Sequence, residues 1–527
     1  MGRDRRTHVP RHVLRRVLCA YRSVIALAKN LVSDDILVAF GRRAPQWARR
    51  SGKDPVAMAH VGILTFSDGR PFVAEEVGAL NRSFQERLRL RLEADGHQVT
   101  TGERIVCSND DAVTESRRLA AAGCDCTIFN FAVWAFPHLA ALASRFAPGP
   151  LLLFSNVNPE YPGLVGMLAS AGGLNQAGTP CVRAYGEIED EQVYRKVRAF
   201  VRSASAVTRL RGQTFGLVGG RPMGMYTATA DPAKWLSLFG VDVEHIDQGE
   251  IVRLSAEVPE RQVDAAFAWL TEHVGAIHYD GKQLTPEKLK LQIRATEAMK
   301  RIIAEYRLNF SGIKGQPELT NTFCTMDVTE AFLNDPYDWD GPHQPHVCAT
   351  EADMDGAMTM QILKLLAETP VLFADVRHYH ADRDLWDLCN SGEHATYFAG
   401  HSFDPKVNLA RVEFFPEGFY FPAGGASVRH VAAPGDATFA RLTRKGGEYW
   451  LAIVRGEFVN FDATTTEDLM RQTTYGWPHA FARFTCSADE LLASYASNHI
   501  HAVYGDWVDE LRLVAQFLGI EAKVYGA

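Results

Sequence analysis

Residues 349–379 read ATEADMDGAMTMQILKLLAETPVLFADVRHY, a stretch in which two acidic residues flank a predicted helix. Apolar residues recur at helical spacing across positions 354 to 366. Thr350 and Asp353 lie three positions apart and resemble a capping box, which opens a helix. We therefore predict a helix that carries Glu351 in its first turn.

A buried strand is predicted directly after this helix. Residues 371–376, VLFADV, follow a proline and are too few, too apolar and too β-branched for a second helix. Asp375 falls near the carboxyl end of this strand, where open α/β sheets bind ligands. Glu351 and Asp375 are thus expected in one site, where paired carboxylates can bind a hard cation and transfer protons.

Two other interpretations of Glu351 need weighing. An acidic residue in the first turn of a helix is ordinarily a surface group that compensates the helix dipole. Glu351, Asp353, Asp355 and Gly356 also imitate the first half of an EF-hand calcium loop. The twelfth position of that loop is Ile362, which cannot coordinate an ion, so a calcium loop is rejected.

The pattern around this stretch predicts an α/β fold with three folded parts. From 58 to 208, apolar strand-like runs alternate with helical stretches, which predicts a doubly wound parallel sheet. A second such domain is expected over 209–370. Residues 371–527 contain short strand-like runs separated by Pro and Gly, which favours a mainly antiparallel, β-barrel-like domain with terminal helices. These runs are 406–416, 418–422, 437–445 and 448–461. GGRPMG near 220 lacks the spacing of a dinucleotide loop.

Composition is ordinary for a soluble protein, with 46% apolar and 22% charged residues among 527. A net charge of −8 argues against a nucleic-acid partner, and no apolar run is long enough to span a membrane. Nine scattered cysteines without a CxxC pair favour reduced thiols and a cytoplasmic protein. Residues 1–57 form an arginine-rich extension that need not be ordered; a transit peptide, an oligomer-contacting arm and an over-extended start all stay open.

Several short motifs resemble the L-fucose isomerase family, of the L-fucose/L-arabinose isomerase superfamily. ATE is followed by FADVR, with the Asp 24 residues after the Glu. Other pieces occur in the family's order, so the chain is identified as a divergent member over about 58–527. They are FSDGR at 66–70, FNFAVWAF at 129–136, VGGRPMGM at 218–225, IKGQPEL at 313–319, NSG at 390–392 and ASNH at 496–499.

The resemblance implies a metal-dependent aldose–ketose isomerase with an enediolate intermediate. Glu351, Asp375 and His499 would be ligands of Mn²⁺ or another divalent cation. The chemistry of the donors agrees, because carboxylate and imidazole groups suit such ions. Glu351 and Asp375 would also act jointly as acid and base. The competing histidines for the ligand position are His378, His380 and His501.

Contacts to the sugar are implied at seven positions, with a solvent or core location as the ordinary alternative for each. Trp134 and Met223 would reach the sugar site of a neighbouring subunit, so a homo-oligomer, a trimer or hexamer, is expected. The seven positions are Arg70, Trp134, Met223, Lys314, Gln316, Trp477 and Asn498.

Two departures from the family bear on the substrate. Lys314 stands where a neutral Gln is expected, and GGASVRH at 424–430 lacks an expected Tyr. These favour a deoxy sugar or an anionic one, such as a sulfonated sugar, over fucose itself. Lys314 could instead pair with Glu318 at i,i+4. A non-catalytic sugar-binding protein and a metal-dependent aldolase or epimerase remain as alternative functions.

Overall fold

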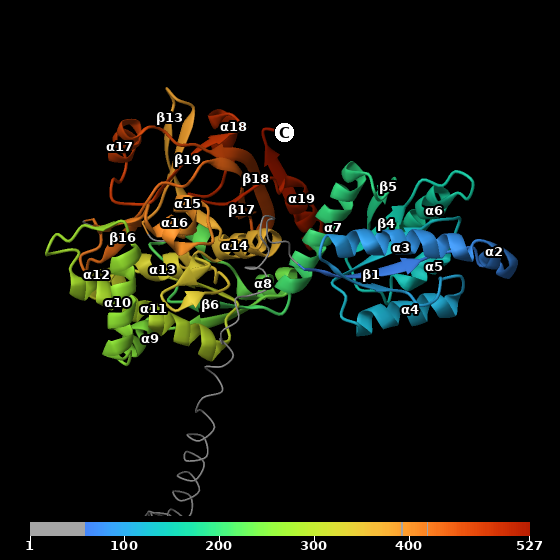
Figure 1. Cartoon of the computed structure of the whole chain (residues 1–527), viewed down its shortest axis with the longest axis horizontal. Coiled ribbons are helices and arrows are strands. Elements are labelled where there is room, and N and C mark those ends of the chain that lie inside the picture. Colours follow the sequence, from blue (N-terminus) through green and yellow to red (C-terminus); the bar gives the residue numbers. More distant parts are fainter. Residues whose placement is uncertain (1–57, 392–393, 419) are drawn as a thin grey trace, which may run out of the picture. The chain divides into compact units, whose positions relative to one another are not determined.

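The computed structural model describes residues 58–391, 394–418 and 420–527. The predicted basic extension over 1–57 lies outside the described residues. The fold is mixed α/β, as expected, with two parallel sheets followed by a mainly antiparallel one (Figure 1).

The first parallel sheet has the order β2-β1-β3-β4-β5. Successive residues of its strands point to opposite faces of the sheet. Leu151 and Leu153 of β4 join one apolar core, and Leu152 and Phe154 join the other. Helices therefore cover both faces, the doubly wound arrangement that the alternation of runs predicted. The strands are β1 (His60–Thr65), β2 (Gln98–Thr101), β3 (Cys126–Phe131), β4 (Leu151–Ser155) and β5 (Val182–Tyr185). The helices are α2 (Pro71–Glu76), α3 (Gly78–Ala94), α4 (Asn109–Ala121), α5 (Pro137–Ala143), α6 (Gly163–Gln176) and α7 (Glu191–Leu210).

The second parallel sheet has the order β12-β9-β6-β7. Its strands are β6 (Thr214–Val218), β7 (Asp242–Ile246), β9 (Phe310–Ile313) and β12 (Cys348–Thr350). Its longer helices are α8 (Pro232–Phe239), α9 (Gly249–Ser255), α10 (Glu260–His273), α11 (Pro286–Tyr306), α13 (Asp327–Asn334) and α14 (Met354–Ala367). Short elements nearby are η2 (Tyr226–Ala228), α12 (Glu318–Thr322), β10 (Tyr337–Asp338) and β11 (Gly341–Pro342).

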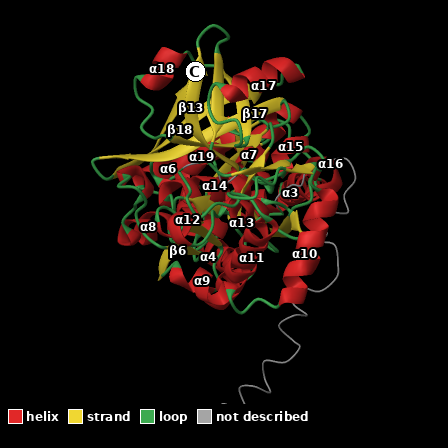
Figure 2. Cartoon of the chain, turned by 90° about the vertical axis from the view of Figure 1, so that its left-hand side faces the viewer, coloured by secondary structure: helices red, strands yellow, loops and turns green. Residues whose placement is uncertain are grey.

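The third sheet closes on itself. Its order is β17-β20-β13-β14-β19-β18-β21, and an additional pairing of β17 with β18 joins the strands into a ring. Strands β13, β17 and β18 of this sheet lie at the top of Figure 2. All neighbours are antiparallel except β21, which lies parallel to β18. The strands are β13 (Leu372–His380), β14 (Leu385–Cys389), β17 (Gly435–Lys445), β18 (Glu448–Phe458), β19 (His479–Phe484), β20 (His499–Tyr504) and β21 (Glu521–Tyr525).

A smaller sheet connects the second and third parts of the chain. β8 (Ala276–Ile277) pairs with β15 (Glu413–Pro416), which pairs with β16 (Ala426–Arg429). The boundaries predicted at 208 and 370 stay predictions. The strand predicted at 418–422 is wrong, because its described residues lie in no strand. The remaining helices are α15 (Tyr397–Gly400), α16 (Pro405–Leu409), α17 (Ala463–Arg471), α18 (Ala488–Leu492) and α19 (Val508–Leu518).

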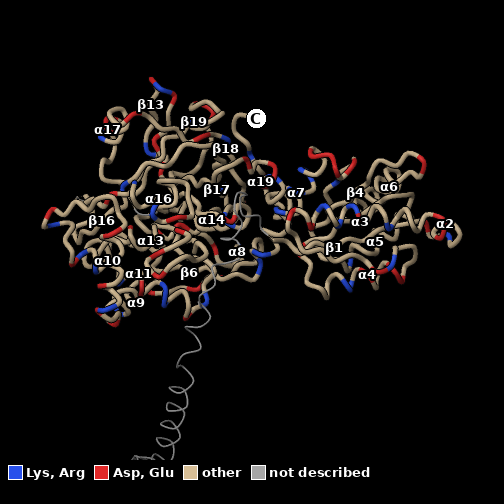
Figure 3. Tube along the Cα trace, viewed as in Figure 1, with Lys and Arg blue, Asp and Glu red and all other residues tan. Residues whose placement is uncertain are grey.

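Helix α14 holds the central position. It contacts α7, the parallel strands β9 and β12, and the ring strands β17 and β20. All but one of its residues are buried, so both ends are fixed by packing. Lys, Arg, Asp and Glu are interspersed along the chain (Figure 3). In the described residues, no helix combines the length and apolarity needed to cross a bilayer.

Candidate functional site

Glu351 lies in a tight turn between β12 and α14. Thr350 is the last residue of β12, and Asp353 is the N-cap of α14, where its side chain accepts a hydrogen bond from Gly356 N at 3.0 Å. The prediction of a capping box with Glu351 in the first helical turn is therefore wrong. Glu351 and Ala352 instead have left-handed backbones, with φ of 55° and 47°. The amide of Ala352 donates to Ile313 O at 2.8 Å, which ties the turn to β9.

Glycine at position 352 is expected to stabilise this turn. A left-handed conformation costs a residue with a Cβ roughly 1 to 2 kcal/mol, and glycine does not incur that cost. Ala352→Gly is expected to raise the free energy of unfolding by about 1 kcal/mol, measured by chemical denaturation. The control Ala357→Gly, in the regular part of α14, should lower it by at least a similar amount. A loss of stability in both variants would contradict the proposed strain.

Asp375 and His499 face each other across two antiparallel strands. β13 and β20 pair in a register that places Asp375 opposite His499. The predicted strand is thus longer than 371–376 and belongs to the antiparallel ring, so the expectation of a carboxyl-end position in a parallel sheet is wrong. Asp375 Oδ2 accepts from Asn390 Nδ2 at 3.1 Å, and Oδ1 accepts from Asn498 Nδ2 at 3.2 Å. Two amides therefore orient this carboxylate.

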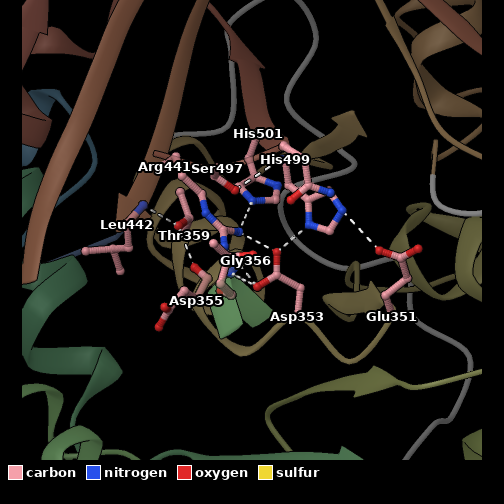
Figure 4. Close-up of polar contacts among 12 residues, drawn as sticks. Glu351, Asp353, Asp355, Gly356, Thr359, Arg441, Leu442, Ser497, His499 and His501 are labelled. Atoms are coloured by element: carbon pink, nitrogen blue, oxygen red, sulfur yellow. Dashed lines mark hydrogen bonds and ion pairs between the residues drawn. The ribbon is translucent and has the colours of Figure 1, made fainter. Parts of the chain in front are cut away.

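His499 lies beside both carboxylates, and Figure 4 shows its contact with Glu351. Its Nε2 lies 3.1 Å from Glu351 Oε2 and 3.5 Å from Asp375 Oδ1. The ring is buried, and Nε2 has no aligned hydrogen-bond partner. Among the described residues, no three or more His, Cys, Asp or Glu side chains are already arranged as a metal-binding group. The three side chains thus meet at ion-pair distances around an unpartnered imidazole nitrogen.

A third carboxylate, that of Asp353, holds the other side of the imidazole. His499 Nδ1 lies 2.6 Å from Asp353 Oδ2. Asp353 also forms a two-pronged ion pair with Arg441 of β17, at 2.5 and 3.1 Å. Both side chains are essentially inaccessible to solvent. Two residues along, Asp355 forms a comparable pair with Arg444 at 2.7 Å.

Burial and neighbouring charges shift the protonation of the site. Burial raises the pKa of the Asp375 carboxyl, and the Glu351 carboxylate adds to that effect. Burial alone would lower the pKa of His499, but the hydrogen bond to Asp353 and the carboxylates of Glu351 and Asp375 raise it to about 10. Burial opposes ionisation of Asp353, yet Arg441 and His499 hold the pKa of that carboxyl well below its usual range.

A small cavity adjoins this site through Thr350. It is lined by Lys314, Gln316, Asp327, Glu330, Thr350 and Ser391 among others, and Glu351 itself does not line it. Lys314 Nζ pairs with Glu318 Oε1 at 2.5 Å. This is the i,i+4 ion pair that the sequence offers as the alternative to a contact with an anionic sugar. The charge of Lys314 is therefore balanced within the chain.

Buried carboxyls lie at this cavity. Asp327 and Glu330 line it, and Glu417, which does not, is buried and interacts electrostatically with Asp327. Trp477 donates its indole N–H to Glu417 Oε2 at 3.0 Å and is buried beside Phe421. Burial raises the pKa of Asp327 to about 7 and raises those of Glu330 and Glu417 well above their ordinary values. Trp477 thus serves as a donor to this acidic group.

Other predicted residues lie apart from the three side chains. Arg70 pairs with Asp68 at 2.6 Å. Across the described chain, no hydrogen bond, ion pair or ring contact links Arg70 or Trp134 to Glu351, Asp375 or His499. Met223 is exposed with a φ of 41°, whereas Met225 Sδ lies 3.8 Å from Asn498 Nδ2.

The competing histidines have other neighbours. His501 is buried and accepts a hydrogen bond from Arg441 Nη1 at 3.2 Å. His378 and His380 contact each other, with ring centroids 4.6 Å apart.

Sequence reasoning missed several residues around the site. The sequence indicates only a capping role for Asp353 and gives Asn390 no role beyond its place in the NSG motif. Arg441 carried no signal at all, because its partner Asp353 is 88 positions away in the chain.

Three family models match most of the described chain. They are L-fucose isomerase, first N-terminal domain, over residues 58–212; second N-terminal domain, over 305–368; and C-terminal domain, over 388–525. Glu351 and His499 fall within matched segments, and Asp375 falls between two of them.

Curated relatives agree with these models. The L-fucose isomerase of Klebsiella pneumoniae is 25% identical over 528 residues, covering 86% of this chain and 88% of the relative. That of Vibrio vulnificus is 24% identical over 439 residues, covering 69% and 75%. That of Bacteroides thetaiotaomicron is 25% identical over 439 residues, covering 68% and 74%.

Proposed function

The chain belongs to the L-fucose isomerase family as a divergent member, and from this premise we propose that it isomerises a neutral monosaccharide at a metal held by Glu351, Asp375 and His499. Its class is that of an aldose–ketose isomerase, an intramolecular oxidoreductase. The observation that carries the proposal is the meeting of two carboxylates at one unpartnered, buried imidazole nitrogen.

The residues fit a divalent cation by their chemistry. His499 Nε2 is a buried nitrogen without a hydrogen bond. Carboxylate oxygens of Glu351 and Asp375 lie within ion-pair distance of it and could bind the same cation. Two carboxylates with one imidazole suit Mn²⁺ and similar ions, and we propose Mn²⁺. The proposal rests on this donor set, since the three side chains are not yet in a metal-binding arrangement.

When bound, the cation would act as a Lewis acid toward the substrate carbonyl. The chain must then move two kinds of proton, one from the carbon beside the carbonyl and one between the sugar hydroxyls. We assign both transfers jointly to Glu351 and Asp375. Asn390 and Asn498 hold the Asp375 carboxylate in one orientation, and burial raises its pKa, which favours its use as a base near neutral pH.

A neutral sugar is favoured over an anionic one. Lys314 already has Glu318 as its counter-ion, and the cavity that Lys314 lines also contains Asp327 and Glu330. An added anion would meet these carboxyls without a free cation from Lys314. Gln316, Asn498 and Trp477 remain proposed sugar contacts together with Lys314, and a deoxy sugar fits this pattern as well as a fully hydroxylated one.

The remaining proposed contacts require other copies of the chain. We propose a homo-oligomer, a trimer or hexamer, in which Arg70, Trp134 and Met223 contribute to a neighbouring subunit's site. We also propose a cytoplasmic location, which the free state of all eight described cysteines supports.

Metal removal tests the proposed function directly. Dialysis of the full chain against EDTA is expected to abolish ketose formation from a panel of neutral and anionic aldoses, and added Mn²⁺ should restore it. In D₂O, NMR should show deuterium on the carbon beside the ketone with the carbon chain intact. An aldolase would give two fragments, and an epimerase would give no ketose. Failure of the Mn²⁺-loaded chain to convert any aldose would overturn the proposal.

A further inference from the structure

Resting on the function proposed above, we infer that Asp353 is a positioning residue, held in place by Arg441, which fixes the His499 imidazole so that Nε2 faces Glu351 and Asp375. Asp353 would not touch substrate or metal itself. In this role Asp353 differs from Glu351 and Asp375, the carboxylates to which we assign the proton transfers.

The contacts of Asp353 leave it no capacity for a ligand. Oδ2 receives His499 Nδ1 at 2.6 Å and Arg441 Nη1 at 2.5 Å. Oδ1 receives Arg441 Nη2 at 3.1 Å and Gly356 N at 3.0 Å. Two donors on each oxygen occupy the lone pairs of a carboxylate. Asp353 is also completely buried, so neither oxygen can turn toward the site.

The hydrogen bond to Asp353 determines which nitrogen of His499 is free. An ionised carboxylate can only accept hydrogen bonds, so Nδ1 must carry a proton in this contact. A cation that takes the place of the Nε2 proton would then meet the lone pair of that nitrogen on the side of Glu351 and Asp375. Phe373 packs against the ring with a centroid distance of 4.5 Å, which limits its rotation. Carboxylate partners of this kind orient metal-binding histidines and raise their basicity.

Arg441 in turn fixes Asp353. Its guanidinium spans Asp353, His501 Nε2 at 3.2 Å and Thr227 O at 3.0 Å, so three separate segments hold it. The packing around the pair is tight at Gly356. A Cβ there would come within 2.6 Å of Asp353 Oδ2 and 2.8 Å of Arg441 Nη1. Gly356 therefore leaves space for the ion pair that a residue with a Cβ would fill (Figure 4).

The chain supplies a matched control in Asp355 and Arg444. This pair also joins the start of α14 to β17, and Asp355 is likewise buried. Its second partner is the Tyr449 hydroxyl at 2.9 Å, and His499 is not among its contacts. Loss of either pair should weaken the packing of α14 against β17, but only loss of the Asp353 pair should release His499.

The experiment compares Asp353→Asn with Asp355→Asn in the full-length chain. Mn²⁺ affinity is measured without substrate, by titration with EPR detection of free Mn²⁺, and thermal unfolding is recorded in parallel. We expect Asp353→Asn to weaken Mn²⁺ binding by about 10- to 100-fold. Asp355→Asn should change the Mn²⁺ affinity less than about threefold.

Asp353→Asn leaves Arg441 buried without its counter-ion and can prevent folding, so charge-balanced doubles are tested beside the singles. Asp353→Asn with Arg441→Gln should fold and still bind Mn²⁺ about 10-fold or more weakly. Asp355→Asn with Arg444→Gln should bind it as the wild type does.

Equal Mn²⁺ affinity in the two double variants would overturn the inference while leaving the isomerase proposal intact. Wild-type protein that binds no Mn²⁺ and converts no aldose would instead overturn the proposed function on which the inference rests.

Discussion

Glu351→Gln is expected to lower the turnover of the Mn²⁺-loaded chain by at least about a thousandfold. The side chain keeps its size, so the turn between β12 and α14 should survive. The amide can neither accept the proton taken from the sugar nor neutralise a cation as a carboxylate does. Glu351 Oε2 is also the carboxylate oxygen closest to His499 Nε2, at 3.1 Å. Both proposed roles are therefore lost in a single substitution.

A matched control exists at the opposite end of the same helix. Glu368 is the C-cap of α14, with a φ of 54° close to that of Glu351, and it pairs with Arg209 at 2.9 Å. Glu368→Gln should leave turnover unchanged. Initial rates of ketose formation and circular dichroism of all three proteins complete the comparison. Wild-type turnover by a folded Glu351→Gln chain would remove Glu351 from the proposed mechanism.

Asp327→Asn is expected to stabilise the protein at pH 8. Burial raises the pKa of Asp327 from its ordinary 3.8 to about 7 in the folded chain. In the unfolded chain the same carboxyl ionises near its ordinary pKa. The folded state therefore binds more protons than the unfolded state between about pH 4 and pH 7, and stability falls as pH rises through that interval. Above pH 7 Asp327 is ionised in the folded and the unfolded chain, so the full cost of burying its charge lowers the stability of the fold.

The expected size follows from the same shift. A pKa that moves from 3.8 to about 7 corresponds to about 4 kcal/mol, and sharing of protons with Glu417 reduces this. We expect Asp327→Asn to raise the free energy of unfolding at pH 8 by roughly 2 to 4 kcal/mol, with a smaller gain near pH 5. Urea denaturation at both pH values measures this difference. Asp382→Asn, at a side chain 76% exposed, is the control for surface charge. If the free energies of unfolding of wild type and Asp327→Asn changed in parallel with pH, the raised pKa of Asp327 would be contradicted.

Local patterns predicted much of the fold. Apolar runs correctly located β1, β3 and β4, because a strand buried on both faces is apolar over most of its length. The sequence located β5 as well, although Arg183 and Tyr185 are exposed. The helical spacing after Asp353 located α14, and the long runs near 437 and 449 located β17 and β18. The strand expected at 406–416 is wrong over 406–409, where the chain forms the short helix α16 under an Asp404 cap.

By itself the sequence determined the α/β class, the family and the three side chains, Glu351, Asp375 and His499, that the structure brings together. These depend on local periodicity and on short motifs, both of which can be read along the chain. Only the tertiary structure decided that Glu351 occupies a left-handed turn, that Asp375 faces His499 across antiparallel strands, and that Lys314 is paired with Glu318.

The ion pair of Asp353 with Arg441, and the hydrogen bond of Asp353 with His499, belong to the same class of facts. They join residues 88 and 146 positions apart. Burial makes such contacts obligatory, since an enclosed charge without a partner costs several kcal/mol. The identity of the partner depends on strand register and on the packing of α14 against the ring strands, which are properties of the tertiary structure.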